Sequence, residues 1–281
     1  TYYYCTHGTI RNIEFEADFA SAGANGERID EEPADYKDIY IKNGDGIDLR
    51  CGCSDILIEN ITGQTEDDSV ALTALKGRSE TRFFVPEKGW DIHHVIIKNV
   101  MTRALSGAQL RLLCADGTRV HDVCADTLVD TSPAQAWQTS IFLGHAILAE
   151  YIRERTCVRG EMTNISIANV FSNSYRAILA GCALENLRIT NLHCRRDVRH
   201  AVMTENIAEL NACLIDGVFC EEGACRDAIF SFCKDTRGAL QIKNVYAQET
   251  ACVVRNEGAI NVELENCRAE RITGALHARE K

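Results

Sequence analysis

The stretch NGDGIDLRCGCSDILIENITGQTEDDSVALTAL, residues 43–75, contains two acidic turns, and each is followed by a short alternating apolar strand. Asp45 lies in the first turn, and Asp67 and Asp68 lie in the second. Asp45 and Asp68 each stand two residues before the first inward apolar residue of their strand, 23 positions apart. Since this is about one turn of a coiled β-solenoid, the stretch predicts that the three carboxylates meet on one face.

A five-residue element, apolar-x-apolar-x-Asn, recurs along the chain and predicts a repeat architecture. Its last position is occupied by Asn12, Asn60, Asn99, Asn169, Asn191, Asn244 and Asn266, with Asp122 and Asp216 interpreted as substitutes. Asn and Asp both tolerate the left-handed turn geometry that such a position needs. After each element a second strand is expected, starting at Ile47, Val70, Leu110, Ile147, Ile178, Val202, Ile229, Val253 and Leu276.

The period-2 alternation of these segments, without intervening helical patterns, indicates short parallel strands. We therefore predict an all-β, single-stranded parallel β-helix of about nine coils, forming a single domain over residues 1–281. Three segments interrupt the period and are interpreted as surface insertions, at residues 16–38, 77–91 and 126–140. The opening TYYYCTHGTIRNIEF is typical of mid-fold sequence, so further coils are expected before Thr1.

The composition argues against nucleic acid and a membrane as partners. The net charge is −11, which disfavours nucleic acid and anionic membranes, and no apolar run approaches the length of a transmembrane helix. The 14 cysteines are scattered and are predicted to be small buried thiols, which slightly favours a cytoplasmic, reducing compartment. A secreted location stays open because of the expected upstream coils, and the oligomeric state is undetermined.

Aligning the nine expected second strands exposes one column of residues, two places before each first apolar position. The column contains Asp45, Asp68, Ala108, His145, Arg176, His200, Asp227, Ala251 and Gly274. Arg111 is predicted to face outward one coil beyond Asp68, and Arg111, His145 and Arg176 are candidate substrate-binding residues. Neighbouring carboxylates can perform acid–base glycoside hydrolysis, and a separation of roughly 6.5–9.5 Å would imply inversion. The same acids could also be plain turn formers or calcium ligands.

The motifs NGDGID and EDDSVAL resemble the N-T-D-G and D-D-C-I-A-I signatures of glycoside hydrolase family 28, the polygalacturonases. The resemblance implies a right-handed parallel β-helix of the pectin-lyase-like class, an inverting hydrolase that needs no cofactor and no metal. By it, Asp67 matches the general acid, and Asp45 and Asp68 match the pair that activates water. The chain departs from the pattern at Gly44 and Glu66, where the family has Thr and Gly.

Two further family motifs are altered. The G-H-G motif should fall at residues 107–109, which read Gly-Ala-Gln and lack the His, and R-I-K has only Arg176 as its nearest match.

From the three carboxylates and this resemblance we expect a glycosidase acting on an oligo- or polysaccharide, with uronic acids among the candidate sugars. One rival is a calcium-dependent polysaccharide lyase with Arg111 or Arg176 as base. The other is a non-catalytic carbohydrate-binding or structural β-helix.

Overall fold

The protein is all-β, with two large parallel sheets and one small antiparallel sheet. The computed structural model describes residues 1–18, 21–23, 25–29, 39–42, 44–76, 85–132, 138–145, 154–205, 207–274 and 277–279. Within these ranges the only helical element is a single 3₁₀ turn, η1 (Pro86–Lys88). The sequence prediction of an all-β fold built from parallel strands is therefore confirmed.

The first parallel sheet consists of nine long strands and is called the long-strand sheet. In sheet order its strands are β1 (Thr6–Glu16), β6 (Ser54–Thr65), β8 (Ile92–Ala104), β10 (Val120–Asp130), β12 (Met162–Ser172), β14 (Ala183–Cys194), β16 (Glu209–Cys220), β18 (Arg237–Thr250) and β20 (Ala259–Ile272). Each strand pairs only with the preceding and following members of this series, so neighbours in the sheet are also neighbours in the repeat.

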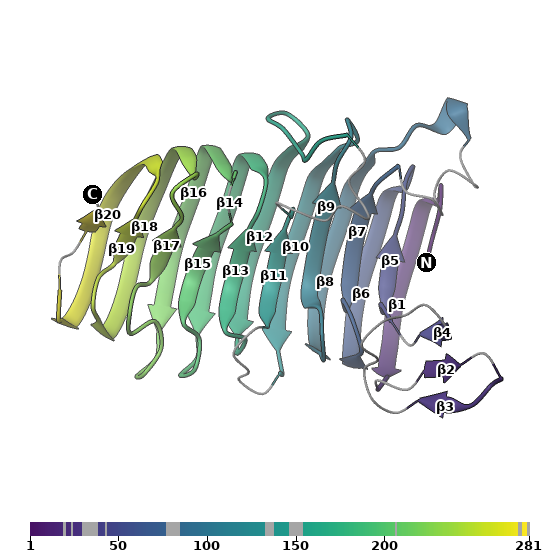
Figure 1. The fold of residues 1–281 in the computed structure, drawn as a ribbon, viewed down its shortest axis with the longest axis horizontal. Coiled ribbons are helices and arrows are strands. Elements are labelled where there is room, and N and C mark those ends of the chain that lie inside the picture. Colours follow the sequence, from purple (N-terminus) through teal and green to yellow (C-terminus); the bar gives the residue numbers. More distant parts are fainter. Residues whose placement is uncertain are drawn as a thin grey trace.

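The second parallel sheet consists of nine short strands and is called the short-strand sheet. In chain order its strands are β5 (Ile47–Leu49), β7 (Val70–Ala74), β9 (Ala108–Cys114), β11 (Thr139–Leu143), β13 (Arg176–Ala180), β15 (His200–Thr204), β17 (Phe230–Phe232), β19 (Val254–Asn256) and β21 (His277–Arg279). From β5 onward the chain passes alternately between the two sheets, and Figure 1 shows the strands stacked along the longest axis. The buried apolar side chains of both sheets form one continuous core.

Left-handed residues inside the long strands explain how these strands bend while keeping one side buried. In β8 the buried residues Ile92, Val95, Ile97 and Val100 are two apart except where a left-handed residue intervenes. The intervening residues, at 94 and 99, have φ of 53° and 55°. Each such residue shifts the alternation by one position, which is why a simple period-2 pattern describes only parts of the long strands.

The asparagine column forms the expected ladder of side-chain hydrogen bonds. Asn60 donates to Asn12, and Asn99 donates to Asn60, at 3.0 and 3.1 Å. In the later strands the same bonds join Asn191 to Asn169 and Asn266 to Asn244. Stacked amides of this kind satisfy one another at each successive bend.

Both predicted substitutes, Asp122 and Asp216, were assigned to the wrong position in this column. Asp122 pairs in register with Asn164 rather than Asn169, so it belongs to a second column of left-handed residues five positions earlier. Asp216 stands one residue before the column position, which is Gly217 with φ of 80°. The Asp216 carboxylate nevertheless accepts a hydrogen bond from Asn244, so it replaces the missing amide.

Several short strands begin at other residues than the sequence predicted. Ile141, not Ile147, is the register partner of Leu110 and Ile178, and residue 147 lies outside the described ranges. The two-before position in that strand is therefore Thr139, and His145 follows the strand instead of preceding it. Sequence patterning failed here because IFLGHAIL contains two apolar runs that are equally good strands.

The last three strands were predicted one residue out of register. Val202 pairs with Phe230, and Phe230 pairs with Val254, so Ala228 and Cys252 replace Asp227 and Ala251 in the column. Val254 pairs with His277, which places the final column position at residue 275 rather than Gly274, outside the described ranges together with residue 276. Consecutive apolar residues at these strand starts allow either register.

The predicted insertions are only partly loops. Segment 16–38 contributes β2 (Ser21–Gly23) and β3 (Arg28–Ile29), which form a small antiparallel sheet with β4 (Ile39–Lys42). Segment 126–140 includes the end of β10 and the start of β11, whereas residues 133–137 with Pro133 and Trp137 lie outside the described ranges, as do residues 77–84. Across the described residues, no helix has the length and apolar character needed to cross a bilayer.

Candidate functional site

Two successive turns at one edge of the short-strand sheet bring three aspartates together. Asp45 precedes β5, while Asp67 and Asp68 lie in the turn that joins β6 to β7. The Gly46 amide donates to the Asp68 carbonyl at 2.9 Å, which fixes one turn on the next. A side chain at Gly46 would meet the Ser69 carbonyl oxygen at 2.6 Å, so the glycine of the Asp-Gly pair permits this close stacking.

The three carboxylates form a compact cluster. One oxygen from each of Asp45, Asp67 and Asp68 lies within 4.8 Å of the others. The Asp45 side chain is 26% exposed, whereas the Asp68 side chain is only 6% exposed. Asp68 Oδ1 accepts the Ala108 amide at 2.7 Å, and a Cβ at Gly107 would lie 2.4 Å from Asp67 Oδ1. The turn before β9 therefore packs directly against the cluster.

Two arginines compensate part of this negative charge. Arg111 Nη1 lies 3.6 Å from Asp68 Oδ2, and Arg50 Nη2 lies 4.0 Å from Asp45 Oδ2. Arg50 Nε is also 2.5 Å from the buried Asp48 carboxylate. The Arg111 guanidinium carbon lies 4.9 Å from the centre of the Phe142 ring, which orients its planar group over an aromatic face.

The carboxylates open into a cavity of about 190 Å³ at the outer face of the short-strand sheet. The residues that line the cavity are Asp45, Arg50, Asp67, Asp68, Thr73, Arg111, Leu113 and His145. His145 Nδ1 lies 3.2 Å from Glu205 Oε2, and its side chain is 22% exposed. His145 is therefore neither in the strand column, as the sequence suggested, nor a buried core histidine; it faces this cavity.

The crowding of carboxylates favours their protonated forms. Burial, reinforced by Asp67 and Asp45 and opposed by Arg111, raises the pKa of Asp68 to about 7. Burial also raises the pKa of Asp45 to about 6, with Asp48 and Asp67 adding to the effect and Arg50 opposing it. Because the groups interact closely, their protons belong to the cluster as a whole, and the cluster retains a proton near neutral pH.

The close approach of the carboxylates bears on the stereochemistry of a hydrolysis. An inverting arrangement needs roughly 6.5–9.5 Å between the two carboxyl groups, and a retaining one about 5–5.5 Å. Here one oxygen of each carboxylate lies within 4.8 Å of one oxygen of the others. This approach of single oxygens does not select between inversion and retention.

The remaining column residues lie outside this cavity lining. Arg176 continues the register of Asp68 through Ala108 and Thr139, so it is three strands away, roughly 14 Å at the usual strand spacing. Burial lowers the pKa of Arg176, and its guanidinium carbon lies 5.9 Å from the Tyr175 ring centre. His200 is buried, and its Nδ1 lies 2.8 Å from the Ala228 carbonyl oxygen. These two residues are not brought to the carboxylates.

Sequence reasoning missed Arg50 and Asp48 as site residues. Both point to the same side of β5 as Arg111 does from β9, since Asp48 pairs with Ala71 and Ala71 pairs with Arg111. The alternation Asp48-Leu49-Arg50 in the sequence contained this signal. It was obscured because an ionisable residue on the outer face of a strand is ordinarily a solvated one.

Among the described residues, two groups of side chains have donor atoms close enough to hold a metal ion. One is the aspartate cluster, whose hard oxygens suit calcium or magnesium. The other is Cys194, Cys220 and Cys225, whose thiols are buried in the core. Cys51 and Cys53 are buried beside Tyr4 and the Tyr2 carbonyl. All 14 cysteines are free thiols, and most are buried, as predicted.

Comparison with known proteins adds no relative to this geometry. No protein-family profile matched the sequence, and no curated protein matched it either.

Proposed function

We propose that this chain is a glycoside hydrolase built on a right-handed parallel β-helix, and that Asp45, Asp67 and Asp68 are its catalytic residues. Support for the β-helix comes from the alternation of the chain between two parallel sheets of nine strands around one core. The observation that carries the catalytic proposal is the meeting of three carboxylates from successive turns in one solvent-connected cavity.

The chemistry requires one proton donor and one proton acceptor on opposite sides of a glycosidic bond. The donor protonates the leaving sugar oxygen while the acceptor removes a proton from the attacking water, so that each proton is accounted for. The resemblance to the polygalacturonases assigns donation to Asp67 and activation of water to Asp45 and Asp68. In this assignment the proton that Asp68 and Asp45 hold passes to Asp67, one oxygen of which lies within 4.8 Å of theirs, before it is donated to the leaving sugar.

Arg111, Arg50 and His145 supply the substrate-facing charges of the same cavity. Arg111 is oriented by Phe142 and by Asp68, which leaves its planar donors directed along the outer face of the sheet. The proposed substrate is an oligo- or polysaccharide, and a sugar acid would pair with these cations. No cofactor enters this reaction.

The decisive experiment measures product release by Asp67→Asn from oligogalacturonate, xylo-oligosaccharide and arabino-oligosaccharide panels. We expect the variant to lose at least about 100-fold in rate on whichever panel the wild-type chain cleaves, because a general acid contributes that much or more. Asp235→Asn, an exposed aspartate in a distant turn, is the matched control and should change the rate less than twofold. Retained turnover by a folded Asp67→Asn would refute the assignment.

A calcium-dependent polysaccharide lyase is the second candidate, and the compactness of the aspartate cluster favours it. Carboxylate oxygens within 4.8 Å of one another can share a divalent cation, with Arg111 as the adjacent base. A lyase product carries a new double bond that absorbs ultraviolet light, and its formation would stop on chelation. Hydrolysis with a chelator present and no such absorbance would exclude the lyase, whereas binding without cleavage on every panel would favour a non-catalytic role.

A further inference from the structure

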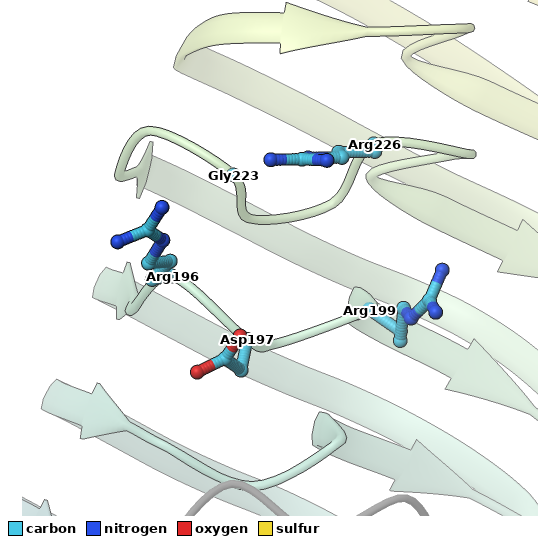
Figure 2. Close-up of a pocket in the computed structure, with 5 residues that line it drawn as sticks. All are labelled: Arg196, Asp197, Arg199, Gly223 and Arg226. Carbon is cyan, nitrogen blue, oxygen red and sulfur yellow. The ribbon is translucent and has the colours of Figure 1, made fainter.

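A second group of charged side chains lies at the same edge of the short-strand sheet, near the C-terminal half of the fold. Arg196, Asp197 and Arg199 lie in the turn between β14 and β15, and Gly223 and Arg226 lie in the connection between β16 and β17. Together they line a cavity of about 540 Å³, drawn in Figure 2. The lining carries three positive charges and one negative charge, in a chain whose net charge is −11.

The arginines of this cavity are largely uncompensated. Arg199 pairs with Asp227 at 3.3 Å, and both side chains are more than half exposed. Arg196 and Arg226 form no ion pair with any residue in the described part of the chain. In Figure 2 the Asp197 carboxylate points away from the Arg226 guanidinium. Arg196 and Arg226 thus line one cavity with no paired carboxylate in the described part of the chain, and a bound anion would stabilise such an arrangement.

Glycine at position 223 leaves room for the guanidinium groups. A Cβ there would lie 3.1 Å from Arg196 Cγ and 3.3 Å from Arg226 Nη2, and the residue has φ of 91°. Figure 2 shows the Arg226 side chain extending toward Gly223, with Arg196 on the neighbouring turn. Two turns therefore present guanidinium groups to a shared space that any other residue at position 223 would reduce.

We propose that Arg196, Arg199 and Arg226 form a binding site for a tetrahedral oxyanion, namely a sulfate or phosphate group. A planar carboxylate is satisfied by one bidentate guanidinium, whereas donors from two turns around one cavity can contact several oxygens of a tetrahedral group. Free inorganic anions and sulfate or phosphate esters on a larger ligand share this chemistry. The site is separate from the aspartates, because β15 is four strands from β7, roughly 19 Å at the usual spacing. It does not rest on the proposed hydrolase activity.

The test is calorimetric titration of the intact chain with sodium sulfate and sodium phosphate, at constant low ionic strength balanced with chloride. We expect saturable binding by the wild-type chain and a loss of at least about tenfold in affinity in the double variant Arg196→Gln/Arg226→Gln. The control is Arg159→Gln, which removes one positive charge, as each substitution of the double variant does. Arg159 is an exposed arginine paired with Glu185, and its substitution should alter the affinity less than twofold. Thermal unfolding verifies that each variant is folded.

A second arm distinguishes the two sources of the anion. A sulfated hexasaccharide derived from heparin is titrated beside unsulfated maltohexaose. Binding of the sulfated sugar at least about tenfold tighter than inorganic sulfate, and lost in the double variant, would assign the site to an ester group on a glycan. Equal affinities per sulfate would assign it to the free anion. Absence of saturable binding to every anion, or equal binding by the double variant, would overturn the proposal.

Discussion

The turns before β7 and before β15 occupy equivalent places in the repeat but carry opposite charges. Following the strand register from Asp68 through Ala108, Thr139 and Arg176 to His200 places Asp67 and Arg199 at the same position, four strands apart. The first turn buries carboxylates among two arginines, whereas the second exposes arginines around one aspartate. The backbone of the repeat thus fixes where a side chain stands, and the turn residues alone decide what chemistry stands there.

The largest expected contrast comes from substituting the glycines that pack against these two turns from the next coil, Gly107 before β9 and Gly223 before β17. In Gly107→Ala the new Cβ would lie 2.5 Å from the Asp68 amide nitrogen and 2.4 Å from Asp67 Oδ1, so the backbone of the turn must move. We expect a loss of about 3 kcal/mol in the free energy of unfolding, measured by urea denaturation.

The matched substitution beside the basic turn is Gly223→Ala, in the connection between β16 and β17. Its new Cβ would meet the Arg196 and Arg226 side chains at 3.1 and 3.3 Å, and these flexible groups can move away. The remaining cost is the left-handed backbone at φ of 91°, about 1 kcal/mol. Equal losses in the two variants would show that the acidic turn is no more tightly packed than the basic one.

The sequence predicted the architecture because the repeat is written in local patterns. Most bends use an Asn, Asp or Gly that accepts positive φ, although His94, Thr127 and Ala212 also adopt it, and each strand alternates between buried and exposed residues. The turn pair around Asp45 and Asp68 was predictable for the same reason, since both belong to strands that align by simple counting.

The failures fall where local pattern is ambiguous or where contacts are long-range. His145 was assigned to the column because a second apolar run follows it, yet it reaches the cavity from beyond the end of β11 and contacts Glu205, 60 positions later in the chain (205 − 145). The ion pair of Arg111 with Asp68 joins neighbouring strands, so the sequence of either strand alone does not specify it. The arginine cavity was missed because its residues come from two turns that no motif marks.

The bends at Asn60 and Asn169 should contribute equally to the stability of the fold, because both asparagines belong to the same ladder. Asn60 and Asn169 each have one ladder partner on either side, and their φ values are 57° and 54°. Substituting either by Ala removes two ladder hydrogen bonds and leaves a β-carbon in left-handed geometry. We expect losses of about 1–2 kcal/mol for both variants in urea denaturation.

Substitution by glycine at the same positions separates the loss of the hydrogen bonds from the strain of the left-handed backbone. Asn60→Gly and Asn169→Gly lose the ladder bonds but adopt positive φ without strain, so each should recover about 1 kcal/mol relative to Ala. A much larger loss at position 60 than at position 169 would contradict the equivalence of the repeat and would mean that the region around the aspartates depends on its own bends.

The smallest effect concerns pH and distinguishes the acidic turn from the basic one. The pKa of Asp68 is raised from 3.8 to about 7 in the native chain, so between about pH 4 and 7 the native state binds more protons than the unfolded state. Native stability contributed by this group therefore falls as the pH rises through that window.

Asp68→Asn has no proton to lose and keeps the Ala108 hydrogen bond through its amide oxygen, so it should lack this fall. At pH 8 we expect the variant to be more stable than the wild-type chain by on the order of 1 kcal/mol, since Arg111 and proton sharing offset part of the cost. Denaturation curves at pH 5 and pH 8 for the wild-type chain, Asp68→Asn and Asp235→Asn measure the difference. A variant that is less stable than the wild-type chain at pH 8 would mean that the ion pair with Arg111 outweighs burial, and the cluster would then be fully ionised rather than poised to hold a proton.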